Sequence, residues 1–559
     1  MTAHRTTPRL VAIAIALAFA ACGPFTAHAQ ALEDLTYTLT PQFGTGRLKV
    51  EITWATRGRT QSALGVAPAF GRIDDVPGML IDVTIDGAQR KRKDGALWIM
   101  LHEKGATLSV SYTVNPGRRN FANWDDVHRP IAGEDFFHGI GNAFLMVPNS
   151  GEGVPGEFQT QLTWRLPAGQ KAVCSWAPAR SAGAPMTPAD LRHSVYLAGN
   201  IATRKVQREG RSVTVAMPEA FEFSIDDFAN LTSAIIDEQI AFMADKGFPS
   251  FVVTAIPAGG KLREGETRLA GSGLYHSFAM FAAPNTKLDD GVVHLFAHEL
   301  FHYWNGRVLG AAQPERLAYW FVEGLTDYYA LRILFESKRW DAATYAKWLN
   351  KHLREYAVNP AVNATNQDIN KKYWSERDTV GQVAYQRGLM LGLRWHHLAR
   401  QKGVREGIDK LFRHLVNRGR AGGFEVGNDA IRTAGIQQLG AWFGEEFDRH
   451  VTRAERVTLP DGVLLPALVG ESRDTFAFEL GFERVRSLRD KKVRGVIAGS
   501  AAATAGLLDG DELTGWTIPT DADSPVVLQV KRGGSAKTIE YFPRGRKQTV
   551  LQFEPAAVP

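Results

Sequence analysis

The chain of 559 residues is poor in cysteine, and it contains no hydrophobic run long enough to cross a membrane. Cys22 and Cys174 are its two cysteines, which excludes a scaffold held together by several disulfides. The apolar run 10–21 is about a dozen residues long, whereas a helix that crosses a bilayer core of roughly 30 Å needs about 20. Neither sign of charge is in large excess over the other. The formal net charge of +6 is spread along the chain and does not favour nucleic acid as a partner.

The N-terminus nevertheless has the pattern of a removed signal peptide. Arg5 and Arg9 precede the apolar run, and Ala27-His28-Ala29 forms a small-x-small cleavage site. We expect cleavage after Ala29, so that residues 1–29 are a signal peptide and the mature protein is secreted or periplasmic. Loss of the two arginines lowers the net charge from +6 to +4. Lipid attachment at Cys22 is the alternative.

Three regions with different residue patterns follow. Between residues 30 and 215, short alternating runs such as Leu48–Trp54 are separated by Gly, Pro and Asp, which predicts a β-rich N-terminal domain. Residues 216–465 show helical spacing of apolar residues and predict a mainly helical domain. Residues 466–559 return to short strands and turns and predict a third, β-rich domain. The expected fold class is therefore multidomain α+β.

The helical domain is expected to include a small sheet. Two strand-like pieces, Phe251–Ile256 and Gly273–Met280, precede the first long helix. Long helices are predicted over five segments, namely Gly291–Trp304, Arg316–Glu336, Trp340–Tyr356, Thr379–Gln401 and Ala441–Val451.

The first of these helices contains the pattern His298-Glu299-Leu300-Phe301-His302. Two histidines four residues apart lie on the same helical face, with Cβ atoms about 5–6 Å apart, so both imidazoles can reach one cation. Zinc suits that arrangement best. Glu299 lies between them, near the open coordination position, where a carboxylate can take a proton from the attacking water. The pattern by itself can also arise by coincidence.

The next helix supplies a third ligand and a supporting carboxylate. Glu323 follows an aromatic and apolar stretch and completes a set of two histidines and one glutamate, with a fourth position left for water. Asp327 lies one turn further on, where it can accept the other ring N–H of a ligand histidine. The alternative for Asp327 is a solvated charge on the helix surface.

Tyr385 opens a later amphipathic helix and is a candidate for a role in catalysis. A phenol at that place could donate a hydrogen bond to the oxyanion of a tetrahedral intermediate. Spacing alone does not show that Tyr385 lies near the metal site, and a buried aromatic is the more common role for such a residue.

Together these residues resemble the glycyl aminopeptidase family of zinc peptidases, which are relatives of the thermolysin-like enzymes. The resemblance includes Trp304-Asn305-Gly306 after the second histidine and a Tyr-x-x-Gly signature that begins at Tyr385. It implies a β-rich N-terminal domain, a thermolysin-like catalytic domain and a C-terminal PDZ domain. It also implies one zinc ion per chain held by His298, His302 and Glu323, with Glu299 as general base, Tyr385 as transition-state stabiliser and peptides as substrates.

One stretch departs from the family pattern. The family carries Gly-Gly-Leu-Glu-His in its substrate-binding strand, whereas this chain has Gly273-Leu274-Tyr275-His276, with tyrosine in place of glutamate. In the related aminopeptidases such a glutamate binds the free α-amine of the substrate, and a phenol is a weaker counter-group for a cation. Gly273, Tyr275 and His276 are candidate substrate-binding residues. His276 can equally be structural.

The C-terminal domain has two pieces that look like PDZ signatures. Leu480, Gly481 and Phe482 form a Leu-Gly-Phe loop, and Ala505–Leu513 follows about 25 residues later. Backbone N–H groups of such a loop can bind the terminal carboxylate of a peptide that adds a strand to the sheet edge. A C-terminal peptide is therefore a possible partner.

Three functions remain open at this point. The first is an aminopeptidase that acts on short peptides. The second is an endopeptidase that has lost amine recognition, in which Arg387 could contact the backbone or a carboxylate of the substrate. The third is a non-enzymatic PDZ scaffold with a structural zinc, which the open ligand set and the presence of Glu299 and Tyr385 disfavour.

Overall fold

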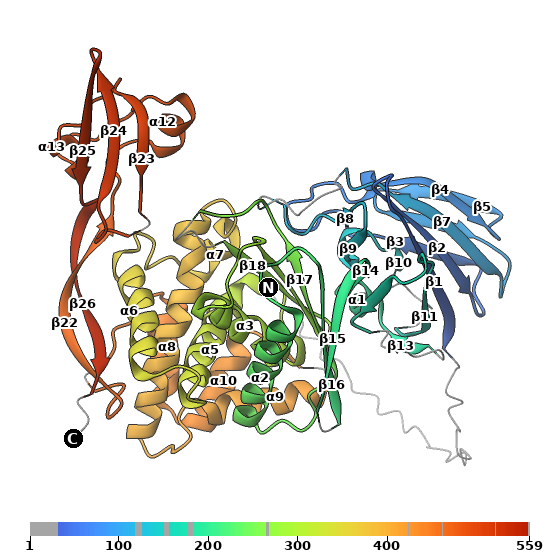
Figure 1. Cartoon of the computed structure of the whole chain (residues 1–559). Coiled ribbons are helices and arrows are strands. Elements are labelled where there is room, and N and C mark those ends of the chain that lie inside the picture. Colours follow the sequence, from blue (N-terminus) through green and yellow to red (C-terminus); the bar gives the residue numbers. More distant parts are fainter. Residues whose placement is uncertain are drawn as a thin grey trace, which may run out of the picture.

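The structure is a computed structural model. It describes residues 32–117, 124, 126–149, 156–176, 183–208, 210–263, 268–422, 424–460, 462–519 and 521–556. The predicted signal peptide, its cleavage site and Cys22 lie outside these residues. A β-rich N-terminal region is followed by a mainly helical region and a smaller C-terminal unit, as the α+β prediction requires (Figure 1). None of the helices in the described ranges combines the length and the apolar character that a membrane span needs.

The N-terminal region is built from three sheets with the strand orders β13-β11-β1-β2-β7-β4, β10-β3-β6-β5 and β12-β14-β9-β8. Its strands are β1 (Glu33–Gln42), β2 (Arg47–Ala55), β3 (Gln61–Gly65), β4 (Leu80–Asp86), β5 (Arg90–Asp94), β6 (Leu97–Leu101), β7 (Thr107–Val114), β8 (Ile131–Ala132), β9 (Phe136–Ile140), β10 (Val147–Pro148), β11 (Phe158–Trp164), β12 (Lys171–Cys174), β13 (Ala184–Met186) and β14 (Val195–Gly199). Alternation explains why they form: in β1, Leu35, Tyr37 and Leu39 are buried on one face. A short helix, α1 (Pro188–Arg192), precedes β14.

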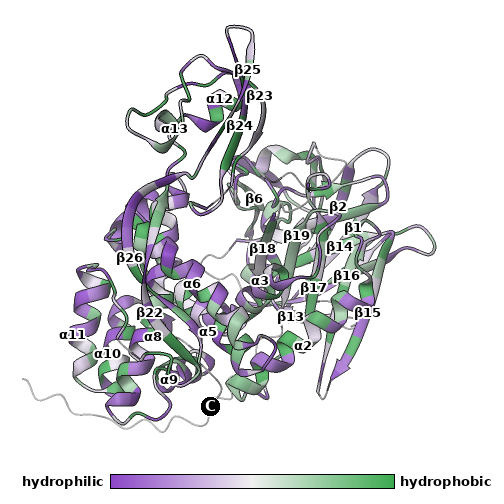
Figure 2. Ribbon diagram, turned by 60° about the vertical axis from the view of Figure 1, so that its left-hand side comes forward, coloured by the Kyte–Doolittle hydropathy of each residue, from purple (hydrophilic) through white to green (hydrophobic). Residues whose placement is uncertain are grey.

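A fourth sheet carries the helical region and has the order β15-β16-β17-β19-β18. Its strands are β15 (Ile201–Arg208), β16 (Arg211–Pro218), β17 (Phe251–Pro257), β18 (Leu269–Leu274) and β19 (Ser277–Ala282). β17 is buried along its whole length and is mostly hydrophobic (Figure 2). The sheet lies between the N-terminal strands and the helices (Figure 1), and apolar residues fill both interfaces.

Two expectations about this sheet were wrong. The predicted boundary at residues 215 and 216 cuts through β16, because β15 and β16 pair with each other and then with β17. Their alternation looks like that of the preceding strands, so the sequence did not show which sheet they join. The predicted single strand Gly273–Met280 is a hairpin of β18 and β19, whose turn is Tyr275-His276. His276 has the positive φ of +43° that this tight turn requires.

Helices cover the other face of the sheet (Figure 1). They are α2 (Ile225–Met243), α3 (Asp290–Phe301), α4 (Tyr319–Val322), α5 (Gly324–Glu336), α6 (Ala342–Val358), α7 (Asn366–Lys372), α8 (Gln382–Gln401), α9 (Asp409–Arg420), α10 (Asn428–Leu439) and α11 (Trp442–Phe447). The Asp289 side chain caps α3 by accepting from the N–H groups of Gly291 and Val292. The helix predicted over Arg316–Glu336 is interrupted at Glu323, where α4 meets α5.

The C-terminal unit is joined to the helical region by a long two-stranded ribbon. Strands β22 (Leu468–Phe478) and β26 (Arg544–Pro555) form it and pack along α6 (Figures 1 and 2), where the Asn350 amide exchanges two hydrogen bonds with the backbone of Phe553. Beyond the ribbon, the remaining elements enclose a small core of their own. They are β23 (Glu512–Thr517), β24 (Val526–Arg532), β25 (Ser535–Tyr541), α12 (Arg484–Asp490) and α13 (Ala501–Thr504).

The loop that the PDZ resemblance points to packs against the core of this unit and is followed by a helix. Leu480 and Phe482 are buried in its core, and Gly481 packs against Ser500 and Ala502. The segment that follows the loop is α12, so a peptide that adds a strand would have to pair with another edge of the unit. The side chains of Leu480 and Phe482 therefore belong to the core of the unit, and the role of the Leu480-Gly481-Phe482 backbone in binding a C-terminal peptide stays a prediction.

Candidate metal centre

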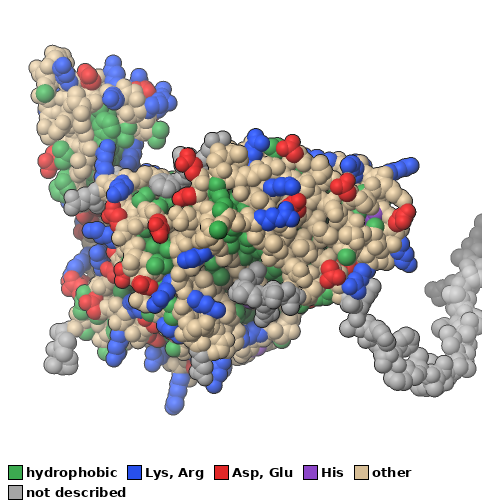
Figure 3. All heavy atoms as spheres, turned by 45° about the vertical axis from the view of Figure 1, so that its right-hand side comes forward, with side chains coloured by type: hydrophobic (Ala, Val, Ile, Leu, Met, Phe, Trp, Pro, Cys, Tyr) green, Lys and Arg blue, Asp and Glu red, His purple; other side chains and the backbone are tan. Residues whose placement is uncertain are grey.

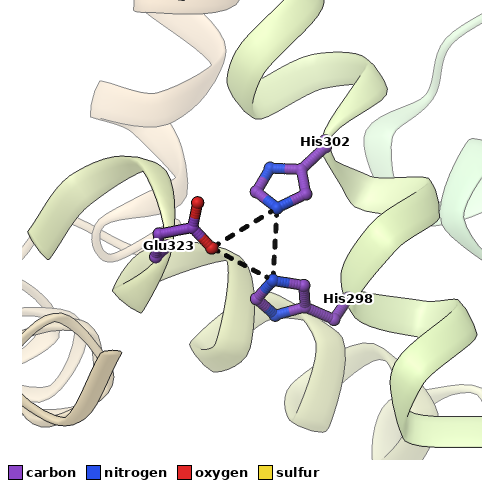
Figure 4. A group of neighbouring side chains, drawn as sticks. All are labelled: His298, His302 and Glu323. Carbon is purple, nitrogen blue, oxygen red and sulfur yellow. Dashed lines mark hydrogen bonds and ion pairs between the residues drawn. The ribbon is translucent and has the colours of Figure 1, made fainter. Parts of the chain in front are cut away.

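Three side chains from two helical elements converge on one point (Figure 4). His298 and His302 lie one turn apart on α3, and Glu323 lies at the junction of α4 and α5. The two Nε2 atoms are 3.2 Å apart, and Glu323 Oε2 lies 3.4 Å from Nε2 of His298 and 3.6 Å from Nε2 of His302. These are the donors that the sequence predicted.

The spacing of the donors matches a zinc ion. Zinc–ligand bonds of about 2.0–2.1 Å in a tetrahedron place neighbouring ligand atoms roughly 3.3–3.4 Å apart. The observed separations of 3.2, 3.4 and 3.6 Å bracket that value. Two imidazoles and one carboxylate leave the fourth position free, which is the arrangement of a catalytic zinc rather than a structural one.

Both histidines are held so that Nε2 faces the common point. Nδ1 of His298 lies 2.7 Å from Oδ1 of Asp327, and Nδ1 of His302 lies 3.0 Å from the carbonyl oxygen of Asn305. With Nδ1 as the donor in each case, Nε2 keeps its lone pair for a metal. Burial alone would raise the pKa of Asp327, but His298 lowers it to about 2, so this carboxylate stays ionised.

Asn305 also ties the two ligand-bearing segments together. Its side-chain amide donates to the carbonyl oxygens of Phe321 and Val322, at 2.8 and 3.1 Å, immediately before Glu323. The backbone leaves helical geometry at Asn305 and Gly306, which turns the Asn305 carbonyl toward His302. The Trp304-Asn305-Gly306 signature thus fixes the distance between α3 and the third ligand.

Glu299 lies against the edge strand β18 and lines the same cavity as the metal ligands. Burial raises the pKa of its carboxyl group, while His302 and His298 act in the opposite direction. A Cβ on Gly271 would fall 3.0 Å from the Glu299 carboxyl carbon, and one on Gly273 would fall 3.4 Å from Cβ of His302. These two glycines let β18 approach α3 closely, which places the strand beside the base.

Tyr385 is close to the metal ligands, as the resemblance implied. Its ring lies 6.0 Å from that of His298, nearly parallel to it, and lines the cavity. The phenol oxygen is 2.9 Å from the hydroxyl of Tyr373 and accepts a hydrogen bond of 3.2 Å from Arg377. Burial raises the pKa of Tyr385 well above that of a free phenol, so it stays protonated.

The cavity has a volume of about 730 Å³ and is bordered by β18, α3, Glu323 and the segment before α8. His128 and Asp190 of the N-terminal region also line it. The cavity is therefore formed jointly by the N-terminal and helical regions, at the open edge of the sheet. Outside the cavity, acidic and basic side chains are interspersed over the face of the molecule shown in Figure 3.

The hairpin turn that carries Tyr275 holds no carboxylate. Tyr275 lines the cavity, with the Arg307 guanidinium 4.8 Å from its ring centroid, and Arg307 is paired with Asp190 at 2.5 Å. His276 stacks on Tyr275 with ring centroids 4.1 Å apart and is not among the residues that border the cavity. The prediction that His276 binds substrate is corrected accordingly, because the turn directs its ring elsewhere.

Arg387 does not reach the cavity either. It is fully buried, and its guanidinium donates to the carbonyl oxygens of Val362 and Ala364 and contacts Asn366. These bonds hold the loop before α7 against α8, so the predicted substrate contact of Arg387 is corrected to a structural role.

Besides Asp190 of the N-terminal region, three charged residues of the cavity were missed by the sequence analysis: Arg307, Glu315 and Arg377. Arg377 lies just before α8, and Glu315 lies in the short helix Glu315–Ala318. Each of these three residues lies in a segment that adjoins a predicted site residue, so the segment could have been expected near the site. Nothing in the local pattern showed which way their side chains point.

Comparison with known proteins agrees with the geometry. Residues 291–390 match the model of the M61 glycyl aminopeptidase family. The fold is similar to that of an aminopeptidase N family protein from Idiomarina loihiensis, with a TM-score of 0.66 and 15% identity over 93% of this chain and 98% of the other. An M1 zinc metallopeptidase from Deinococcus radiodurans is 16% identical over 77% of this chain and 95% of the other, with a TM-score of 0.49. A search of curated protein sequences gave no match.

The family match covers the whole stretch from His298 to Tyr385, so it falls on the residues that build the metal centre. The resemblance to the glycyl aminopeptidase family is thereby confirmed. The site and this match together define a zinc metallopeptidase.

Proposed function

We propose that the protein is an aminopeptidase that hydrolyses short peptides with one zinc ion per chain, held by His298, His302 and Glu323. The observation that carries the proposal is the convergence of these donors, Glu299 and Tyr385 on one cavity beside the edge strand β18. When bound, zinc supplies a Lewis acid that polarises the scissile carbonyl and makes water a stronger nucleophile.

Glu299 and Tyr385 would perform the remaining chemistry. Glu299 takes a proton from the attacking water and returns it to the nitrogen of the leaving amine. Burial raises the pKa of Glu299, and a raised pKa suits a carboxyl group that both accepts and releases a proton near neutral pH. Tyr385 donates a hydrogen bond to the carbonyl oxygen as negative charge develops there.

Strand β18 is the proposed support for the peptide backbone. It is the last strand of its sheet, and no strand pairs with its outer edge within the described ranges. Free backbone N–H and C=O groups on such an edge can pair with an extended peptide. Gly273 lies in this strand next to Glu299, so a peptide bound there would pass over the metal centre.

Glu315 is the proposed anchor for the free α-amine. It lines the cavity, and in the part of the chain that the structure describes it forms neither an ion pair nor a side-chain hydrogen bond. Burial raises the pKa of Glu315, and the nearby Glu323 raises it further, so a cationic group would be stabilised beside it. Asp190, a cavity carboxylate that belongs to the N-terminal region, is already paired with Arg307.

An endopeptidase is the second candidate, and the turn at Tyr275 favours it. The position at which the family carries an amine-binding glutamate holds a phenol with a guanidinium over its ring. A cation there repels a second cation, so this position does not recognise a free N-terminus.

Hydrolysis of matched peptides with free and acetylated N-termini tests the two candidates, with zinc content measured on the same samples. Cleavage of free N-termini alone supports the aminopeptidase. Equal cleavage of both peptides supports the endopeptidase. Cleavage of neither by fully zinc-loaded protein overturns both and would favour the scaffold hypothesis.

Export of the protein and the PDZ-like nature of its C-terminal unit are proposed as well. Export with cleavage after Ala29 rests on the sequence pattern, and the mass of the mature protein purified from culture medium or periplasm would test it. Mass added at Cys22 would instead identify a lipoprotein. Residues 466–559 are proposed as a PDZ-like unit because of the Leu-Gly-Phe loop, with the C-terminus of a peptide as the proposed ligand of the backbone N–H groups of that loop.

A further inference from the structure

We propose that Arg377 is a positioning residue for Tyr385: it binds the phenol oxygen and thereby directs the phenol hydrogen into the cavity. This inference rests on the proposed peptidase function and adds a residue that neither the sequence pattern nor the family resemblance supplied.

Arg377 is the first residue of the segment Arg377–Gly381, which leads into α8. Its Nη2 lies 3.2 Å from the phenol oxygen of Tyr385. The guanidinium carbon is 4.5 Å from the ring centroid of Tyr373 and 5.1 Å from that of Tyr385, with Trp374 at 6.0 Å. Three aromatic rings therefore fix the guanidinium beside the phenol.

The direction of the hydrogen bond between Arg377 and Tyr385 follows from the chemistry of the guanidinium. A guanidinium has N–H donors and no acceptor, so the Tyr385 oxygen must accept from Arg377. The hydroxyl of Tyr373 lies 2.9 Å from the same oxygen, and either hydroxyl can be the donor of that bond. When Tyr373 donates, both lone pairs of the Tyr385 oxygen are occupied, and the hydrogen of Tyr385 is free to bond to an oxygen in the cavity.

The positive charge of Arg377 adds to this effect. A hydrogen bond from a charged donor withdraws electron density from the phenol oxygen and makes its O–H a stronger donor. Arg377 also acts to lower the pKa of Tyr385, although burial dominates and the net shift is upward. Such a donor, already oriented before the reaction, stabilises an oxyanion without further reorganisation.

The surroundings of Arg377 are not those of a structural arginine. No carboxylate pairs with it among the residues described, and its Nη1 is a buried atom without a hydrogen-bond partner. Burial of an unpaired guanidinium costs free energy that the aromatic contacts offset in part. Arg387 also has a buried nitrogen without a partner, its Nε, but it donates to the oxygens of Val362, Ala364 and Asn366 and does not line the cavity.

The test is a double-mutant cycle with Arg377→Met, Tyr385→Phe and the combined variant, together with Arg377→Lys. Lys372→Met is the matched control, because it removes a cation from α7 that does not line the cavity. For each protein, kcat and KM are measured with a peptide that the wild type cleaves. Zinc content, melting temperature and the affinity for a phosphinic peptide, which mimics the tetrahedral oxyanion, are measured in parallel.

We expect Arg377→Met to lower kcat by about 10- to 100-fold with little change in KM, and to weaken phosphinic-peptide binding by a similar factor. In the Tyr385→Phe background, Arg377→Met should have almost no further effect, because the phenol oxygen that Arg377 binds is absent. Arg377→Lys should restore part of the loss, and zinc content should not change.

Other outcomes would overturn the inference. Fully additive effects in the double variant would mean that Arg377 does not act through Tyr385. A higher KM with unchanged kcat would make Arg377 a contact for the substrate itself. Wild-type protein that carries zinc and hydrolyses no peptide would overturn the proposed function, and this inference with it. An active wild type with an unimpaired Arg377→Met variant would overturn this inference alone.

Discussion

Gly388 of α8 and Gly324 of α5 face each other so closely that a Cβ built on either would lie 2.5 Å from the Cα of the other. A Cβ on Gly388 would also fall 1.8 Å from the carbonyl oxygen of Trp320. Because Gly324 directly follows Glu323, this contact brings α8 against the third metal ligand. Tyr385 lies one turn before Gly388, so the Tyr-x-x-Gly signature delivers the phenol to the metal centre.

Gly388→Ala should therefore destabilise the protein by about 1–3 kcal/mol or more, since the new methyl group must push two helices apart. The midpoint of urea unfolding measures the effect. Gly260→Ala is the matched control, because a Cβ at Gly260 meets nothing within 4 Å. Equal midpoints for the two variants would show that α8 and α5 are not packed as described.

Glu299→Gln should retain zinc and lose about 10²- to 10⁴-fold in kcat, because the amide preserves the shape of the side chain but cannot accept the proton. Metal analysis and steady-state kinetics on one preparation separate the two effects. Glu425→Gln, on an exposed residue, serves as the control. A variant that loses zinc in proportion to activity would make Glu299 a supporting residue of the metal site rather than the base.

Asp327→Asn should weaken zinc binding by about 10- to 100-fold while leaving the three ligands in place. The carboxylate is 2.7 Å from Nδ1 of His298, and a neutral amide at that distance no longer enhances the basicity of the ring. Competition with a chromogenic chelator gives the affinity. An unchanged affinity would return Asp327 to the role of an ordinary buried polar residue.

The metal centre was predictable where its geometry is local. His298 and His302 share one helical face, so their spacing alone places both rings at one point, and Glu299 between them follows from the same helix. Glu323 was predicted from the pattern of the next helix, and the role of Tyr385 from the family resemblance. The approach of both residues to the histidines depends on Asn305 and on the contact of α5 with α8.

The residues that line the rest of the cavity could not be read from the sequence, because long-range packing sets the direction of each side chain. Arg377 and Arg387 are ten positions apart and of the same residue type, yet three aromatic rings hold Arg377 in the cavity while Arg387 is buried against loop carbonyls. The turn at Tyr275-His276 escaped notice because it contains no glycine or proline.

The alkaline limb of the pH profile should not come from Tyr385. Burial raises the pKa of the phenol well above its ordinary value, and a phenol can donate a hydrogen bond only while it is protonated, so the competent form extends to higher pH. Profiles of kcat from about pH 6 to about pH 10 should run parallel for wild type and Tyr385→Phe, offset by roughly 10²- to 10³-fold. An alkaline decline present in the wild type and absent from Tyr385→Phe would contradict this assignment.

Glu315→Gln should selectively impair peptides with a free N-terminus. A hydrogen bond to a charged group contributes about 1.5–3 kcal/mol, so we expect KM for such a peptide to rise roughly 10- to 100-fold, while an acetylated peptide is unaffected. The ratio of kcat/KM for the two peptides is the measurement, since it cancels any general loss of active protein. Asp190→Asn provides the comparison: it also changes a carboxylate that lines the cavity, but one already paired with Arg307, so both peptides should respond alike. If Glu315→Gln leaves the ratio at its wild-type value, the α-amine is not bound by Glu315. In that case Glu299 and Glu323 are the cavity carboxylates that remain without an arginine partner among the described residues, and both already have roles in the reaction. The endopeptidase then explains the site better.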